Sequence, residues 1–97
     1  MSRYILSSKA VLDLSDIWDY SAEQWGVVQA DRYIRSIHEA CQLLASGKLK
    51  GTSADFIRAG YRKQIVGMHL LFYRMTVDGV IDVVRILHQR MDVGRHL

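Results

Sequence analysis

The sequence predicts one α+β domain, residues 1–97, with elements in the order β-α-α-β-β-β. Two observations predict this class. Two stretches of helical apolar spacing fill the first half of the chain. In the second half, the β-prone runs Met68–Val77 and Val80–Leu87 flank Asp78-Gly79. Strands joined by short links pair antiparallel, so we expect an antiparallel helix hairpin packed on an antiparallel sheet.

The first three elements follow from local signals. Arg3–Leu6 is short and β-prone, and Ser7-Ser8 then supplies a serine N-cap for a helix over Lys9–Gln24. Its predicted core face contains Val11, Leu14, Trp18 and Trp25. Its opposite, solvated face contains Asp13, Asp16, Asp19 and Glu23.

Gly26 separates this helix from a second, Val28–Ser46, which Gly47 ends as a C′ residue. One face of the second helix contains Ala30, Tyr33, Ile34, Ile37, Cys41 and Leu44. The link at Gly26 is short, so the two helices should form a hairpin. Cys41 lies on the apolar face, and we interpret it as a core residue rather than a reactive thiol.

The second half begins with a predicted loop over Lys48–Phe56 and a strand over Ile57–Ile65. Val66-Gly67 should turn the chain into the Asp78-Gly79 hairpin. The tail, Gln89–Leu97, is too short and polar to join the sheet.

Asp78-Gly79 predicts a two-residue type I′ turn with positive φ at both positions. One strand face then contains Leu70, Phe72, Arg74, Val83, Arg85 and Leu87, paired as Arg74–Val83, Phe72–Arg85 and Leu70–Leu87. A guanidinium is rarely buried without a partner, so we expect this face to be open or to contact a partner protein. The helices should cover the opposite face, at Leu71, Tyr73, Val84 and Ile86.

Composition excludes several classes. The one cysteine rules out an internal disulfide framework and a cysteine-based zinc cluster. No apolar segment is long enough for a signal peptide or a membrane span, so we expect a cytoplasmic protein. Residues 1–47 contain four Lys and Arg against six Asp and Glu, whereas residues 48–97 contain nine against four. This asymmetry favours an anionic partner, either nucleic acid or an acidic protein segment.

No motif marks a catalytic centre. His69 and His88 should lie opposite each other near the open end of the hairpin, and His96 follows on the tail. The spacing does not indicate a metal site, and no cofactor-binding loop is present. The basic, histidine-containing surface has the groups that cleave RNA without a metal, but the spacing alone favours a solvated face that binds a protein. It comprises Arg62, Lys63, Arg74, Arg85, His88, Arg90, Arg95 and His96.

Several motifs in the right order carry a family resemblance. They are IRAGYR at Ile57–Arg62, GMHLLFYR at Gly67–Arg74, VRILHQRMD at Val84–Asp92 and ADRYI at Ala30–Ile34. With these motifs the chain resembles the RelE/ParE toxin superfamily, and within it the ParE branch. The resemblance implies a cytoplasmic toxin of a type II toxin–antitoxin system. A ParD-like antitoxin would bind the toxin, cover the second face of its sheet and bind operator DNA, which the toxin reaches only through the antitoxin.

The resemblance also implies two alternative activities. ParE-type toxins poison DNA gyrase, whereas RelE-type toxins cut messenger RNA on the ribosome. Arg62, Arg90 and His96 stand at positions of the ribonuclease set, but Leu70 stands where that set has an arginine. Losing one such charge should cost roughly 3 to 4 kcal/mol of transition-state stabilisation, which favours the gyrase poison. A third alternative is a protein without toxicity that serves only as a co-repressor.

These considerations predict a partner-binding surface for gyrase or the antitoxin. Its charged members are Arg74, Arg85, Arg90, Arg95 and His96, and its apolar members are Leu70 and Phe72. If the protein is a ribonuclease, Arg62, Arg90 and His96 would be catalytic instead.

Overall fold

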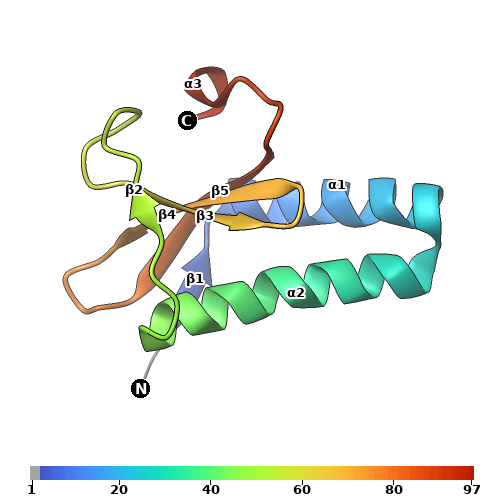
Figure 1. Ribbon diagram of the computed structural model, residues 1–97, viewed down its shortest axis with the longest axis horizontal. Coiled ribbons are helices and arrows are strands. Elements are labelled where there is room, and N and C mark those ends of the chain that lie inside the picture. The colour runs from blue at the N-terminus through green and yellow to red at the C-terminus, as the bar shows by residue number, and fades with distance from the viewer. Residues whose placement is uncertain (1–2) are drawn as a thin grey trace.

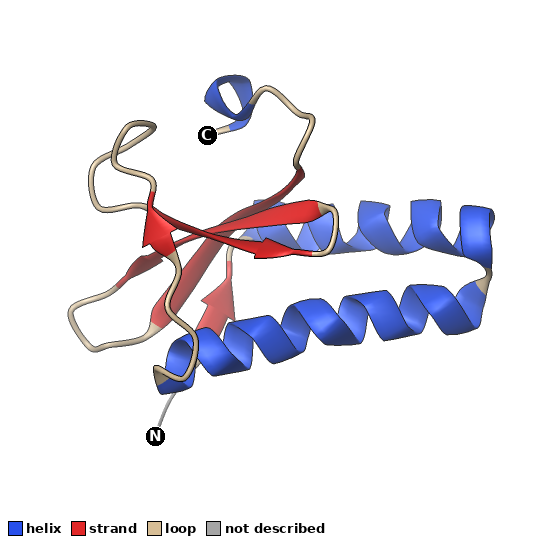
Figure 2. Ribbon diagram, in the orientation of Figure 1, coloured by secondary structure: helices blue, strands red, loops and turns tan. Residues whose placement is uncertain are grey.

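A computed structural model describes residues 3–97, and it contains the predicted α+β architecture (Figure 1). The elements are β1 (Tyr4–Leu6), α1 (Ser8–Trp25), α2 (Val27–Ser46), β2 (Thr52–Ser53), β3 (Arg62–Val66), β4 (His69–Met75), β5 (Ile81–His88) and α3 (Val93–His96). The two long helices form the predicted hairpin on one side of the sheet, and their connected ends project beyond the strands (Figure 2). Within residues 3–97, no helix is long and apolar enough to cross a membrane.

Local signals set the helix ends as the sequence predicts. The Ser7 side chain accepts a hydrogen bond from the Ala10 N–H and so caps α1. Gly26, with φ of 92°, makes the tight link between the helices. Gly47, with φ of 79°, ends α2 in the left-handed conformation that glycine adopts without strain.

The sheet has the strand order β1-β5-β4-β3-β2 and is mixed rather than wholly antiparallel. β1 pairs parallel with β5, with Tyr4 opposite Ile81, while the other pairs are antiparallel. The connection from β1 to β5 contains the helix hairpin and three strands, so it is long enough for the crossover that a parallel pair requires. The N-terminal strand therefore lies at one edge, beside the last strand.

β3 is shorter than the prediction, because it begins at Arg62 rather than Ile57. The residues before it form a compact loop. The Ala54 N–H donates to the Tyr61 carbonyl at 2.7 Å, and the Asp55 carboxylate accepts from the Gly60 N–H at 2.8 Å. Gly60 has a φ of 85°, which breaks an extended run.

The β4–β5 hairpin is confirmed, but its turn differs from the predicted type I′. The Gly79 N–H donates to the Thr76 carbonyl at 3.0 Å, and the Thr76 N–H donates to the Val80 carbonyl at 2.9 Å. Gly79 has a φ of 78°, and no non-glycine residue among residues 3–97 has a positive φ. The loop is therefore a three-residue turn with glycine in the left-handed position.

A β-bulge changes which residues of β5 face the helices. Phe72 pairs with Arg85, as predicted, but Tyr73 pairs with Val83, so Val84 is an extra residue in β5. The predicted pairing of Leu70 with Leu87 is also confirmed, whereas the predicted pair Arg74–Val83 is wrong. Arg74 lies opposite Asp82 instead. Side chains alternate between faces, so the extra residue puts Val83, not Val84, on the helix side.

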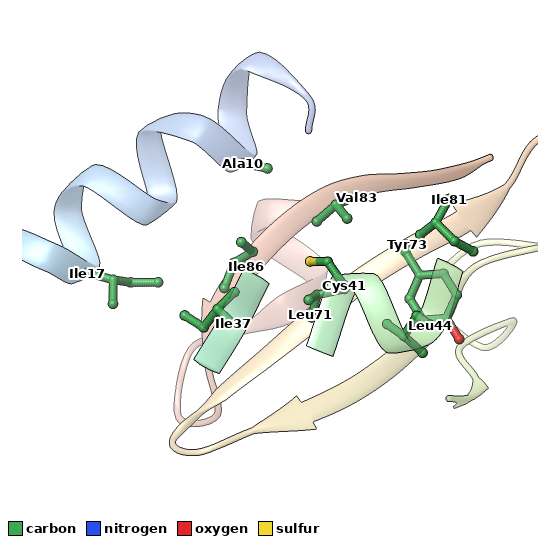
Figure 3. Packing of buried hydrophobic residues seen from close by; sticks show 10 residues of the cluster. All are labelled: Ala10, Ile17, Ile37, Cys41, Leu44, Leu71, Tyr73, Ile81, Val83 and Ile86. Carbon is green, nitrogen blue, oxygen red and sulfur yellow. The ribbon is translucent and has the colours of Figure 1, made fainter. Parts of the chain in front are cut away.

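The main core lies between the helix hairpin and the sheet (Figure 3). Its buried members are Ala10, Ile17, Ile37, Cys41, Leu44, Leu71, Tyr73, Ile81, Val83 and Ile86. The second helix presents the predicted face. On α1 the buried positions are Ala10, Ile17 and Ser21, so the predicted core positions Val11 and Trp25 are wrong and both are exposed.

A second cluster covers the opposite face of the sheet. Phe72 and Leu87 are each 1% exposed and pack with Ala54 and Tyr61. Partly buried residues pack against it from the loop before β3 (Ile57), from the strands β4 and β5 (Leu70 and Val84) and from the tail (Val93 and Leu97). We expected this face to be open or covered by a partner. That expectation is wrong at the centre of the face, because the chain covers it with its own residues.

Beyond β1, the side of β5 that faces away from β4 has no neighbouring strand, and α1 with its cap satisfies the backbone there. The Ser7 hydroxyl donates to the Val84 carbonyl at 2.6 Å. The Ile86 N–H donates to the Asp13 carboxylate at 2.9 Å. Asp13, which we expected on a solvated face, is therefore part of the junction between α1 and β5.

Candidate partner-binding surface

A cleft of about 770 Å³ lies between the projecting half of the helix hairpin and the turn between β3 and β4. Helix residues form one wall, and the β3–β4 turn and the segment after β5 form the other. It is lined by Asp16, Ile17, Tyr20, Ser21, Trp25, Gln29, Tyr33, Met68, His69, His88, Arg90 and Met91. Its lining is mostly apolar and aromatic, which is typical of a binding site.

The floor of the cleft consists of Tyr33 and His69, which are joined by a hydrogen bond, and His88, whose ring lies edge-on to that of His69. The Tyr33 hydroxyl lies 2.6 Å from His69 Nδ1, and it accepts from the Met68 N–H at 3.0 Å. His69 and His88 are opposite each other across β4 and β5, as predicted, with ring centroids 5.3 Å apart. His88 Nδ1 accepts from the Arg90 N–H at 3.1 Å. The three rings are thus held in place by both sheet and backbone.

Two groups on the floor, His69 and Tyr33, are uncharged at neutral pH. Burial, together with the neighbouring His88, lowers the pKa of His69 to about 4, although Asp13 acts in the opposite direction. Burial also raises the pKa of Tyr33, although the hydrogen bond from the Met68 N–H lowers it. Uncharged groups at this place favour an apolar or aromatic ligand over an ion.

The rim of the cleft exposes several large hydrophobic side chains. Trp25 is 64% exposed and stacks edge-on against Tyr20, with ring centroids 6.0 Å apart. Met68 and Met91 are exposed across from them. Exposed tryptophan and flexible methionine around one hollow are typical of a protein-binding surface.

Arg85, predicted to contact a partner, is bound inside the molecule. Its Nε and Nη2 atoms donate to the two Asp13 carboxylate oxygens at 2.9 and 2.8 Å, and its Nη1 donates to the His96 carbonyl at 2.8 Å. The hydrogen bond to Asp13 raises the Arg85 pKa, and burial opposes this. The Arg85 and Asp13 side chains are only 15% and 11% exposed. Arg85 thus joins β5, α1 and the tail.

The other predicted surface residues divide into two groups. Phe72 is buried in the second cluster and Leu70 packs against it, so neither forms an open apolar face. The remaining residues are exposed. Arg74 pairs with Asp82 at 2.9 Å, Arg95 lies near Asp92, and Arg90 lines the cleft.

The candidate ribonuclease residues do not form one site. Arg62 lies opposite Tyr73, and its Nη2 donates to the Gly51 carbonyl, beside a hollow near the end of α2. Arg90 follows β5 at the opposite end of β4, where His69 pairs with His88. Tyr73 and His69, which mark these two ends, are four positions apart along β4, a distance of about 13 Å. Among residues 3–97, no group of three or more His, Cys, Asp or Glu side chains could hold a metal.

Sequence reasoning missed the cleft because it placed Trp25 in the core and treated Met68 as the start of a strand. One signal was available. Trp25 directly precedes Gly26, and a side chain at the very end of a projecting hairpin has little core to enter.

Comparison with known proteins gives consistent results. Residues 4–93 match the family model described as the ParE toxin of the type II toxin–antitoxin system parDE. The chain is 51% identical over 96 residues to Toxin ParE1 of Mycobacterium tuberculosis, covering 99% of this chain and 98% of that protein. It is 40% identical over 97 residues to Toxin ParE1 of Caulobacter vibrioides, covering 100% and 99%.

A solved structure titled as the chromosomal ParDE TA system from P. aeruginosa has a similar fold. The TM-score is 0.77 at 21% identity, and the match covers 91% of this chain and 96% of that chain. This likeness supports the fold assignment.

Proposed function

This chain belongs to the ParE family of toxins of type II toxin–antitoxin systems, and on that premise we propose that it poisons DNA gyrase and is neutralised by a ParD-like antitoxin. The full-length identity with proteins named Toxin ParE1 carries the proposal. A gyrase poison acts where the chromosome is replicated, which places the protein in the cytoplasm.

We assign the cleft to the antitoxin. Its rim exposes Trp25, Tyr20 and two methionines, and His69 on its floor is uncharged at neutral pH. An amphipathic segment with apolar anchors would bury these side chains, as helices do in hydrophobic grooves. Arg90 at the edge of the cleft would then face acidic residues of the same segment.

The proposed action is by binding rather than by chemistry. Arg62 and Arg90 lie at opposite ends of the sheet, and Leu70 offers no charge where the ribonuclease set has an arginine. A phosphorane transition state needs cations and proton-transfer groups within hydrogen-bond reach of one phosphate. This separation favours the gyrase poison over the ribonuclease alternative.

The test of the activity is a pair of assays on one preparation. Purified protein is incubated with gyrase, plasmid DNA and ATP and scored for linear plasmid, and it is also added to translating ribosomes and scored for cut messenger RNA. We expect linear plasmid and intact RNA. Cut RNA with intact plasmid would assign the protein to the ribonuclease branch, and no effect in either assay would leave the co-repressor alternative.

The test of the antitoxin site uses two residues of equal exposure. Trp25 lines the cleft, whereas Leu12 lies on α1 outside it, and both are 64% exposed. We expect Trp25→Ala to weaken antitoxin binding by about 30-fold or more, the usual cost of an interface hot spot, as measured by calorimetry. Leu12→Ala should change it less than threefold. Equal effects of the two substitutions would exclude the cleft as the centre of the interface.

A further inference from the structure

The segment from residue 48 to 74 is strongly basic. It contains six Lys and Arg against one acidic residue, Asp55. The Asp55 carboxylate is itself engaged by the Gly60 N–H at 2.8 Å. The segment forms the β2–β3 edge of the sheet, the loop beside it and most of β4, and although its Met68 and His69 line the cleft, none of its cations does.

Five of the six cations in this segment have no carboxylate partner. Within residues 3–97, Lys48, Lys50, Arg58, Arg62 and Lys63 form no ion pair with Asp or Glu. Elsewhere in the basic half, Arg85 is neutralised by Asp13, and Arg74 by Asp82. This edge of the sheet therefore contains several unpaired positive charges close together in the sequence.

An exposed aromatic ring stands among these cations. Phe56 is 74% exposed, and the Lys63 ammonium lies 5.2 Å from the centroid of its ring. The Arg58 guanidinium lies 5.6 Å from the ring of Tyr61. Lys63 is thus held beside the exposed ring of Phe56, while Arg58, two residues further along the same loop, is held against the buried ring of Tyr61.

We propose that Phe56, Arg58 and Lys63 form a binding site for a single-stranded polynucleotide, with the cations on its phosphates and a base stacked on Phe56. Proteins that hold single strands without sequence preference combine a basic groove with an aromatic platform in this way. An acidic protein segment would satisfy the charges equally well, but it brings no planar base for Phe56. The ring is what favours the nucleic acid.

The experiment measures binding of the isolated protein, without gyrase or antitoxin, so its outcome is separate from the gyrase assay. The probes are fluorescein-labelled 15-mers of deoxythymidine and of uridine, followed by anisotropy at several salt concentrations. Each phosphate contact in a single strand contributes about 0.7 to the slope of log K against log salt, so the two cations of the site, Arg58 and Lys63, should give a slope of about −1.4. The tighter of the two probes identifies DNA or RNA as the ligand.

Substitutions separate the charge from the ring. We expect Lys63→Ala and Arg58→Ala each to flatten the slope by about 0.7, because each removes one phosphate contact. Phe56→Ala should weaken binding roughly tenfold and leave the slope unchanged, because stacking is not ionic. The matched control is Arg35→Ala, which removes an exposed cation from α2 and should change the affinity less than twofold. Circular dichroism spectra establish that each variant is folded.

Two results would overturn the proposal. In one, the three site variants bind the probes as the Arg35→Ala variant does. In the other, a 15-residue polyglutamate peptide displaces the probes at equal charge concentration and Phe56→Ala has no effect, which would assign the surface to an acidic protein.

Discussion

Removing the Asp13 carboxylate should destabilise this domain more than any other single change on its charged surface. One carboxylate accepts two hydrogen bonds from Arg85 and a third from the Ile86 N–H, all between 2.8 and 2.9 Å. Asp13→Ala leaves the guanidinium without its partner and leaves one backbone N–H of β5 unsatisfied. Both groups lie under α1, where water has limited access.

The size of the effect follows from how buried the pair is. Removing one partner of a fully buried ion pair costs about 3 to 5 kcal/mol. The Arg85 and Asp13 side chains keep 15% and 11% exposure, so we take the lower end, about 3 kcal/mol. In a domain of this size that corresponds to a fall in Tm of roughly 12 to 24 °C.

The assay is equilibrium unfolding in urea at pH 7, followed by circular dichroism. The control is Arg74→Ala, which breaks the ion pair with Asp82, where the arginine side chain is 57% exposed, and should cost about 0.5 kcal/mol or less. A loss below 1 kcal/mol for Asp13→Ala would refute the reasoning. Arg85→Ala should likewise lower stability, so any loss of partner affinity must be measured under conditions where the variant stays folded.

Three further predictions concern a glycine, the cysteine and a histidine. Gly51→Ala should cost about 3 kcal/mol or prevent folding, because its Cβ would overlap the Lys63 carbonyl, whereas Gly94→Ala meets only ordinary contacts and should be neutral in the same urea assay. Burial raises the pKa of Cys41 to about 12, so the native thiol should resist Ellman's reagent and react only when urea unfolds the protein. Because burial lowers the pKa of His69 to about 4 from its ordinary 6.5, the unfolded chain binds more protons between these values. Stability should therefore fall as pH drops from 6.5 to 4, and His69→Gln should flatten that part of the profile.

The elements that local rules determine could be predicted from the sequence. The cap at Ser7 and the left-handed glycine at Gly47 set helix ends to within a residue or two. The pairing of Leu70 with Leu87 also followed from the hairpin. Each of these depends on neighbours in the chain or on one tight turn, so no tertiary information was needed.

Features that depend on tertiary contacts could not be predicted. The prediction had a two-residue turn and no bulge. The third turn residue shifts the strand pairing by one position, and the extra residue Val84 shifts it back. The predicted pair Phe72–Arg85, beyond the bulge, is therefore right, whereas the partner predicted for Arg74, between the turn and the bulge, is wrong. The chain's own loop and tail cover Phe72, and Arg85 pairs with Asp13. Both contacts join segments that are far apart in the sequence. An apolar pattern shows that a face is covered but not by which segment.

The exposure of Trp25 could not be predicted for the same reason, because it depends on tertiary structure. Trp25 repeats the helical spacing of a core residue, yet α1 extends past the sheet at that point, so the side chain is left exposed beside Tyr20. Helix length relative to sheet width decides this, and periodicity contains no such information.

The parallel pairing of β1 with β5 has a consequence for synthesis of the protein. Ser7 and Val84 are 77 residues apart, and Asp13 and Arg85 are 72 apart, so the first strand and helix find their partners only after β5 has been synthesised. Until β5 leaves the ribosome, β1 has no neighbouring strand and Asp13 of α1 has no ion-pair partner. A nascent chain that stops before β5 therefore cannot complete the fold.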